Sequence, residues 1–220
     1  MIYGIQKLSL VDYPSLPSFV IFLGGCNFRC PFCHNSSIVN KTETTYEIDD
    51  VLLEIQKRSA FLNAVVITGG EPTLYGEKLI ELLKQIKKLH LQIKLDTNGT
   101  NPKLLKKILD LNLVDYIAMD IKNTWEKYEE TVGCPVDLDK IKQSIEIIET
   151  SKKDYEFRMT INKTMHKKED ILSVQNYVKE KKRFFLQPYK QQPTQIIKQD
   201  FGEWTKEELQ ELEEAFSIKA

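Results

Sequence analysis

The chain has 220 residues, with 31 Lys and Arg against 32 Asp and Glu and a formal net charge of -1. This near-neutral balance gives no general attraction to nucleic acid or to an anionic membrane surface. Hydrophobic residues make up 41% of the chain, which holds only nine Gly and eight Pro, and this composition excludes a disordered or collagen-like protein.

The amino terminus and the cysteines indicate a soluble protein of a reducing compartment. No charged stretch followed by a long apolar run opens the chain, and the longest purely apolar run, 19–23, is far too short to span a bilayer. Three of the four Cys fall between positions 26 and 33, a spacing that indicates metal or redox chemistry rather than disulfides. We therefore expect a cytoplasmic protein with no membrane and no nucleic-acid partner.

Short apolar runs rich in β-branched and aromatic residues recur along the chain, and each predicts a strand buried on both faces. In chain order these runs are 19–23, 64–67, 93–95, 116–119, 156–161 and 184–186. Apolar residues with helical spacing lie between them, over 79–86, 104–109 and 138–148. An acidic amphipathic helix over about 205–216 is expected to close the domain through Leu209, Leu212 and Phe216.

The alternation of strands and helices predicts the α/β class, with parallel strands joined by helical crossovers. Six predicted strands are too few for a closed eight-stranded barrel, and no Gly-x-Gly-x-x-Gly follows the first strand. We predict a partial (β/α)6 TIM-like barrel, one domain over 1–220 with its core at about 16–190. Its active face should lie at the carboxyl ends of the strands.

A short loop directly after the first predicted strand contains Cys26, Cys30 and Cys33 in the pattern Cys-x3-Cys-x2-Cys. Soft sulfur ligands select zinc or iron-sulfur. Structural zinc takes four protein ligands, and His34 follows Cys33 too closely for both side chains to reach one metal easily. Three thiolates with an open position therefore favour a [4Fe-4S] cluster whose fourth iron is free. Cys134 is expected to be a loop or buried thiol.

The later strands also run into polar or glycine-containing segments at their carboxyl ends. These are Thr68-Gly69-Gly70-Glu71-Pro72-Thr73, Asp96-Thr97-Asn98-Gly99-Thr100, Asp120-Ile121-Lys122, Arg158 within its strand, and Gln187-Pro188-Tyr189. Two consecutive Gly let the backbone approach a ligand closely, and Glu71 could receive an ammonium group. Each segment alone could be an ordinary turn or cap, but their recurrence after consecutive strands predicts one shared site.

These motifs resemble the radical S-adenosylmethionine (SAM) superfamily, through Cys26-x3-Cys30-x2-Cys33 and Gly69-Gly70-Glu71-Pro72 in that order. More narrowly, the chain resembles the anaerobic ribonucleoside-triphosphate reductase activating proteins, within the glycyl-radical enzyme activating family. The residues that carry this narrower resemblance, found between 4 and 189, are Asp12-Tyr13-Pro14, the loop 25–35, Asp96-Thr97-Asn98-Gly99-Thr100, Ala118-Met119-Asp120-Ile121-Lys122 and Glu156-Phe157-Arg158. One departure is Ser15, where the group often has Gly.

The resemblance implies a role for each matching residue. Cys26, Cys30 and Cys33 would hold three irons of a [4Fe-4S] cluster, and the amino and carboxylate groups of SAM would chelate the fourth. The implied SAM contacts are Gly69, Gly70, Glu71 and Pro72 at the methionine amino group, Phe32 on adenine with His34 and Asn35 beside it, Asp96, Thr97, Asn98 and Asp120 near the ribose, Lys122 toward the nucleoside or carboxylate, and Arg158 and Gln187 at the mouth. In pyruvate formate-lyase relatives, the positions of Asp96, Thr97 and Asp120 also correspond to a monovalent cation site.

The implied reaction is reductive cleavage of SAM to a 5′-deoxyadenosyl radical, which installs a glycyl radical on an anaerobic ribonucleotide reductase. A one-electron donor such as flavodoxin or ferredoxin would be a second partner. No side chain is required as acid or base, and His90 and His166 are expected at the surface or at helix ends. Three alternatives stay open: an activase of the pyruvate formate-lyase type, a radical SAM enzyme for a small molecule, and a non-catalytic metal-binding module.

Overall fold

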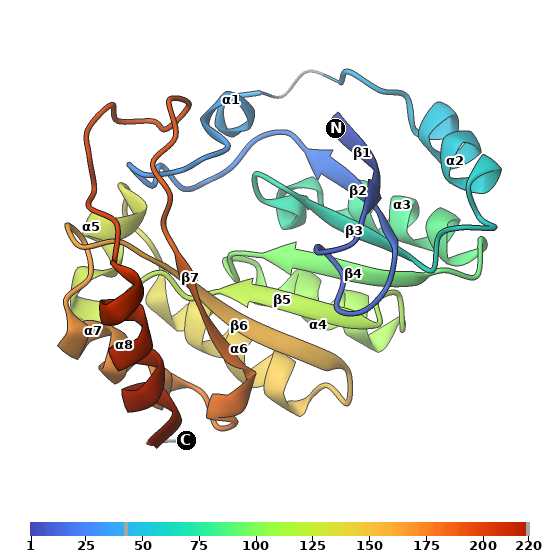
Figure 1. Ribbon diagram of the computed structural model, residues 1–220. Helices are drawn as coiled ribbons and strands as arrows, with labels where there is room; N and C mark the ends of the chain where they lie inside the picture. Colours follow the sequence, from blue (N-terminus) through green and yellow to red (C-terminus); the bar gives the residue numbers. More distant parts are fainter. Residues whose placement is uncertain (42–43, 219–220) are drawn as a thin grey trace.

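The computed structural model describes residues 1–41 and 44–218. Its centre is one seven-stranded sheet in which the strands follow chain order (Figure 1). The strands are β1 (Ile2–Ser9), β2 (Ser18–Leu23), β3 (Ala64–Gly69), β4 (Gln92–Thr97), β5 (Tyr116–Asp120), β6 (Asp154–Ile161) and β7 (Phe184–Pro188). Strands β2 to β7 run parallel, so the six predicted strands and the partial barrel are confirmed.

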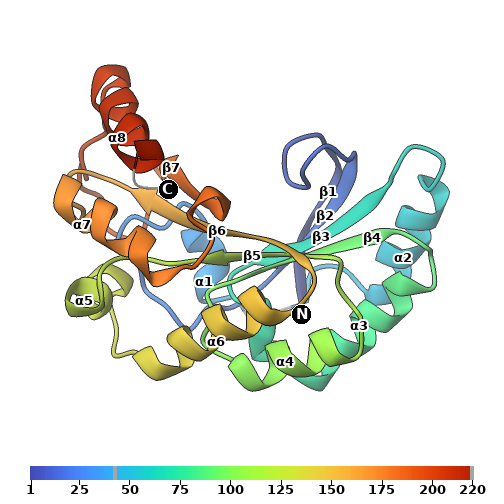
Figure 2. The same ribbon diagram turned by 90° about the horizontal axis from the view of Figure 1, so that it is seen from below.

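Helices connect the parallel strands and cover the convex side of the curved sheet, as α3, α4 and α6 show in Figure 2. The α-helices are α1 (Ser36–Val39), α2 (Ile48–Lys57), α3 (Glu77–Lys87), α4 (Pro102–Asp110), α5 (Tyr128–Val132), α6 (Leu138–Thr150), α7 (Lys168–Val174) and α8 (Lys206–Ile218), with short 3-10 turns at Pro72–Tyr75, Trp125–Lys127, Gln175–Tyr177 and Lys181–Arg183. The three predicted internal helices are confirmed as α3, α4 and α6. No helix within the described ranges is long and apolar enough to cross a membrane.

The two faces of the sheet differ in chemistry, and this corrects the prediction that every strand is buried on both faces. In β6, buried Phe157 and Met159 alternate with half-buried Glu156 and Arg158. In β7, Phe185 is 49% exposed. Because the barrel is partial, the concave side of its later strands lacks a covering layer, and polar side chains occupy that side.

The first strand, β1, was not predicted. It pairs antiparallel with β2 at the edge of the sheet, and its middle is exposed at Gln6, Lys7 and Leu8, so it lacks a continuous apolar run. The loop between β1 and β2 contains Ser15 at φ 62°. This is the left-handed region that favours glycine, and it accounts for the expectation of Gly at that position.

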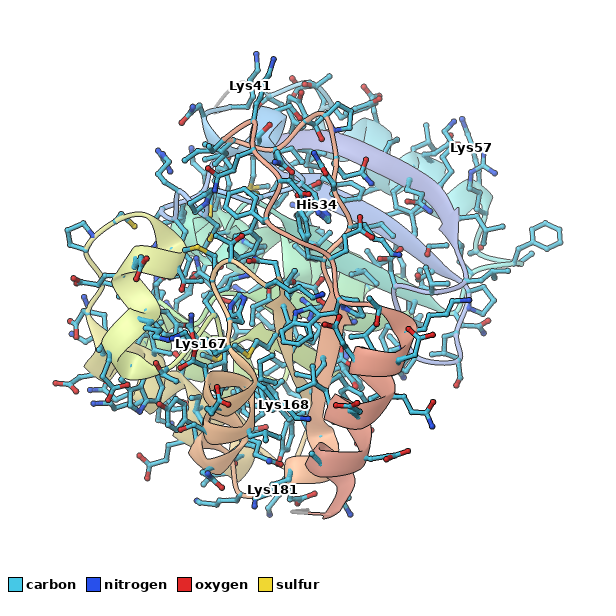
Figure 3. The ribbon with its side chains drawn as sticks, turned by 60° about the vertical axis from the view of Figure 1, so that its left-hand side comes forward. His34, Lys41, Lys57, Lys167, Lys168 and Lys181 are labelled. Atoms are coloured by element: carbon cyan, nitrogen blue, oxygen red, sulfur yellow. The ribbon has the colours of Figure 1, made fainter. Side chains whose placement is uncertain are left out.

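The carboxyl-terminal part of the chain returns to the cysteine loop (Figure 1). Residues 189–201, which we call the C-terminal strap, follow β7. The Ile197 backbone N–H donates to the Pro31 carbonyl at 3.0 Å, and the Thr194 hydroxyl donates to the His34 carbonyl at 3.0 Å. Figure 3 shows His34 beside this segment. The strap therefore covers the cysteine loop from outside the sheet.

Helix α8 follows the strap and confirms the predicted terminal helix. Leu212 is buried and Leu209 is partly buried against the core, while Glu208 and Glu211 pair with Lys163 and Lys168. The helix packs against α7. The side chain of Phe216 lies outside the described residues.

Candidate active site

The cysteine loop is held in place by backbone hydrogen bonds to three other segments. The Gly25 and Cys26 N–H groups donate to the carbonyls of Ile38 and Val39 in α1. The Glu71 N–H donates to the Gly25 carbonyl at 2.8 Å, and the Arg29 N–H donates to the Val132 carbonyl at 2.8 Å. The ends of β2, β3 and α5 therefore meet around the three cysteines.

A cavity of about 260 Å³ opens beside these cysteines at the carboxyl ends of the strands. Most of the predicted site residues line it: Cys26, Cys30, Phe32, Cys33, His34, Asn35, Gly69, Gly70, Asp96, Thr97, Asn98, Asp120, Lys122, Arg158 and Gln187. Four residues without an individual predicted role also line the cavity: Phe28 and Thr68, which belong to the predicted site segments, and Val39 and Thr160, which do not. Thr68 and Thr160 lie near the ends of β3 and β6 on their concave side, so strand alternation could have found them.

Burial controls the protonation of the three thiols. It raises the pKa of Cys26 to about 11 and that of Cys30 to about 12, and it also raises the pKa of Cys33. The positive charge of Lys122 opposes this effect at all three positions. Because iron binds thiolate rather than thiol, assembly of a cluster here must release protons.

The donor set fits a three-cysteine iron-sulfur cluster with a small polar ligand beside it. Three thiols line one wall of the cavity, and Cys134 is not among its lining residues. No group of three or more His, Cys, Asp and Glu side chains in the described part of the chain is arranged for a single metal ion. The remaining wall offers the Gly69 and Gly70 backbone, hydroxyls, amides and charged groups, which suit the ammonium, carboxylate and ribose groups of SAM.

Cys134 is a half-buried loop thiol, as predicted. Its sulfur lies 3.4 Å from the Asn27 carbonyl oxygen, to which it donates. The residue therefore supports the outer side of the cysteine loop without facing the cavity.

Glu71 and Pro72 are the predicted site residues that the structure does not place in the cavity lining. The Glu71 carboxylate is fully buried and accepts hydrogen bonds from the Thr73 N–H at 2.9 Å, the Thr73 hydroxyl at 2.5 Å, the Thr97 hydroxyl at 2.9 Å and the Asn98 N–H at 2.6 Å. Pro72 begins the 3-10 turn that follows. In this structure Glu71 accepts hydrogen bonds from within the protein and joins the ends of β3 and β4, while the expected contact with an ammonium group stays a prediction.

Aromatic rings form the wall beside the last cysteine. Phe32 is 4% exposed and meets Tyr189 and Phe201 edge to face, at ring-centre distances of 6.3 and 5.9 Å. The His34 ring lies 5.5 Å from the Tyr189 ring. The sequence did not single out Phe201, which reaches this wall only because the C-terminal strap folds back.

Charged side chains on the concave side of β4, β5 and β6 form the floor of the cavity. Arg158 Nε lies 3.0 Å from Asp120 Oδ1, and Lys122 Nζ lies 3.0 Å from Asp120 Oδ2. Burial alone would raise the pKa of Asp120, but Arg158 and Lys122 outweigh it and lower the pKa to about 2. Asp120 is therefore ionised and already paired with two cations of the protein itself.

His166 is buried, 1% exposed, and lies directly before the N-cap residue of α7. Of the two expected positions it therefore takes the helix end and not the surface, whereas His90 is exposed. The Asn162 backbone N–H donates to His166 Nδ1 at 3.1 Å, and Nε2 lies 2.9 Å from the Lys122 carbonyl oxygen. Nδ1 is thus the acceptor and Nε2 the donor, as in neutral imidazole. The ring holds the backbone of Lys122 at the cavity.

We expect His166 to make folding stability fall in mild acid. Burial lowers the pKa of His166 in the folded chain, so the unfolded chain binds the proton more tightly. Stability is then complete above about pH 6.5 and falls below it, by up to about 1.4 kcal/mol per pH unit. Urea unfolding between about pH 7.5 and 5.5 measures this slope. His166→Gln should flatten it, His90→Gln should leave it unchanged, and an equal slope in all three proteins would contradict the assignment.

Comparisons with known proteins agree with this geometry. The family model of the radical SAM superfamily matches residues 20–179. A Methanocaldococcus jannaschii protein, provisionally named as a glycyl-radical enzyme activating enzyme, is 34% identical over 222 residues, which cover 99% of this chain and 91% of the relative.

Two further relatives share part of their length with this chain. The pyruvate formate-lyase-activating enzyme of Listeria monocytogenes is 31% identical over 131 residues, or 55% of this chain and 52% of the enzyme; the chain thus matches about half the length of that relative. The crystal structure of Streptococcus suis SuiB bound to S-adenosylmethionine superimposes with a TM-score of 0.69 at 18% identity, over 91% of this chain and 48% of SuiB. The chain belongs to the radical SAM superfamily, among the relatives of the glycyl-radical enzyme activating enzymes.

Proposed function

We propose that this chain is an activating enzyme that installs a glycyl radical on an anaerobic ribonucleotide reductase in the cytoplasm. The observation that carries the proposal is the single cavity in which three thiols face the Gly69–Gly70 backbone and the charged floor. Radical SAM proteins use a [4Fe-4S] cluster and SAM, and the lining fits both. The near full-length similarity to an activating enzyme supports a protein substrate. The motifs Asp12-Tyr13-Pro14 and Cys30-Pro31-Phe32-Cys33-His34-Asn35 support the reductase as the partner.

A bound, reduced [4Fe-4S] cluster would supply the one electron for cleavage of SAM into methionine and a 5′-deoxyadenosyl radical, and transfer of one hydrogen atom from a glycine of the partner would leave 5′-deoxyadenosine and the glycyl radical. The protein binds, orients and excludes water. Cys26, Cys30 and Cys33 would hold the cluster, and the Gly69 and Gly70 backbone would approach the methionine part of SAM. Phe32 and its aromatic neighbours would keep water from the adenine, since this wall is buried.

The concave side of the sheet supports a polypeptide substrate. Phe185 on β7 is 49% exposed. It lies two residues before Gln187, on the same side of the strand, and Gln187 lines the cavity. An apolar side chain therefore remains uncovered on this edge strand beside the cavity. An extended glycine-containing segment of the partner would cover it and would itself exclude water from the cavity.

The test is SAM cleavage by anaerobically reconstituted protein. Iron, sulfide, a one-electron reductant and SAM are supplied, with or without the reductase, and 5′-deoxyadenosine is measured together with the glycyl radical signal by electron paramagnetic resonance. We expect cleavage that the reductase stimulates and a radical signal on the reductase. Cleavage without that signal would reject the reductase as substrate and favour pyruvate formate-lyase or a small molecule. Absence of cleavage by iron-replete, reduced protein would reject the enzyme.

A further inference from the structure

A lysine to which the sequence analysis assigned no role lies beneath the floor of the cavity, in contact with a residue that lines it. Lys94 lies on β4, two residues before Asp96 and on the same concave side. Its side chain is 5% exposed. The ammonium donates to the Asp12 carbonyl at 2.7 Å and to Glu156 Oε1 at 3.2 Å, and it lies 5.4 Å from the centre of the Tyr116 ring. A lysine is seldom buried without partners, and here partners come from the loop between β1 and β2 and from the concave side of β5 and β6.

Lys94 completes a charge balance below the SAM cavity. Three carboxylates converge there, from Asp96, Asp120 and Glu156, and three cations face them, from Lys94, Lys122 and Arg158. We call these six residues the charged network. Its formal charge is zero because each acid has a counterpart. Without Lys94, three partly buried carboxylates would share two cations.

Loss of the Lys94 charge would act most directly on one carboxylate oxygen of Asp96. Asp96 Oδ1 is buried and makes no hydrogen bond in the described structure, and Lys94 Nζ lies 3.8 Å from it. Asp96 Oδ2 faces the Arg158 guanidinium at 3.5 Å. A buried carboxylate oxygen without a donor is an attractive position for a cation, and the ammonium of Lys94 supplies that charge from within the chain.

The resemblance to pyruvate formate-lyase relatives led to the expectation of a dissolved monovalent cation near Asp96 and Asp120, and the charged network does not fit it. Both oxygens of Asp120 are taken by Arg158 and Lys122 at 3.0 Å, and Asp96 lies between Arg158 and Lys94. An added K⁺ or Na⁺ would give the network a net positive charge. It would also have to displace a cation that is covalently part of the chain.

We propose that Lys94 is a built-in substitute for a monovalent cation, so that SAM binding in this cavity does not depend on K⁺ or Na⁺. Lys94 is thus a positioning residue that acts through Asp96 and Glu156 on the orientation of Arg158. The inference rests on the proposed function only for the identity of the ligand, SAM.

The test compares chloride salts of K⁺, Na⁺ and choline at equal ionic strength. The dissociation constant for SAM is measured on anaerobically reconstituted protein, and the melting temperature is measured on protein without cluster or SAM. For the unmodified chain we expect the SAM affinity to change by less than about twofold among the three salts. For Lys94→Met we expect affinity about tenfold weaker in choline, with K⁺ or Na⁺ restoring most of it. K⁺ should also raise the melting temperature of Lys94→Met and not that of the unmodified chain.

Two further variants separate charge balance from a merely structural role. Lys94→Met combined with Glu156→Gln restores a neutral network and should be independent of the cation again. Lys87→Met removes another lysine with a close carboxylate, Asp115 at 2.8 Å, on the outer helix α3, and should lower stability equally in all salts. Two results would overturn the inference. One is a SAM affinity of the unmodified chain that rises about tenfold with K⁺, and the other is a Lys94→Met variant whose SAM affinity and melting temperature do not change with K⁺. The melting measurements need neither SAM nor a partner, so their failure is separable from failure of the proposed function.

Discussion

Gly70→Ala is expected to displace the cysteine loop and to remove most of the iron that the protein can bind. A Cβ at position 70 would lie 1.9 Å from the Gly25 carbonyl oxygen, 2.5 Å from the Gly25 carbonyl carbon and 3.1 Å from the Cys26 nitrogen. All three are backbone atoms, so no side-chain rotation relieves the clash. Because the clash moves Cys26 itself, we expect a loss of about 3 kcal/mol in unfolding free energy.

The measurement is iron content after anaerobic reconstitution, together with urea unfolding followed by circular dichroism. The matched control is Gly76→Ala. Gly76 has φ +54° and ψ -125°, with no atom within 4 Å of a Cβ, so its replacement should cost about 2 kcal/mol through backbone strain alone and should leave iron binding intact. Full iron content in Gly70→Ala would contradict the close approach of Gly70 to Gly25 and Cys26 in the cysteine loop.

Glu71→Gln is expected to destabilise the fold by about 3 kcal/mol, since one buried acceptor becomes a donor. Oε1 accepts three hydrogen bonds and Oε2 accepts one from the Asn98 N–H. With the amide oxygen on the three-donor side, the new NH2 group points at the Asn98 N–H. Two donors then face each other without water, and the ends of β3 and β4 separate.

Urea unfolding and SAM affinity together test this role. Glu77→Gln is the control, because Glu77 is 74% exposed and pairs with Lys107 on the surface, where such a change costs less than about 1 kcal/mol. If Glu71 acted on the SAM ammonium group instead, Glu71→Gln would keep its stability and lose affinity alone. That result would support the expectation drawn from the sequence.

The sequence predicted the parts of the site that depend on local pattern. Residue type and position along the chain predict the cysteine loop and the segments after β3, β4 and β5. The parallel topology then brings the carboxyl ends of these strands to one edge of the sheet. The alternation of Tyr155, Phe157 and Met159 with Glu156 and Arg158 also indicated a strand with one polar side. The prediction that this strand is buried on both faces did not take the two-residue period into account.

Other parts depend on contacts between distant segments and leave no local pattern. A single Lys94 within a strand usually indicates an exposed side, and its partners Asp12 and Glu156 lie far away in the sequence. The expectation for His166 left a surface position and a helix end open. Its burial results from packing against the loop after β5 and against Phe32, at 6.0 Å between ring centres, and neither contact is visible in the local sequence. The position of Glu71 inside the protein likewise depends on Thr97 and Asn98 of the next strand.

The C-terminal strap has a consequence for the order of events during synthesis on the ribosome. The three cysteines leave the ribosome well before the segment that covers them, which is held by Ile197 on Pro31 and by Thr194 on His34. A nascent chain therefore exposes its cysteine loop until that segment has been made. Iron delivered before then would meet an open loop, and iron delivered later would meet a loop that the C-terminal strap already covers.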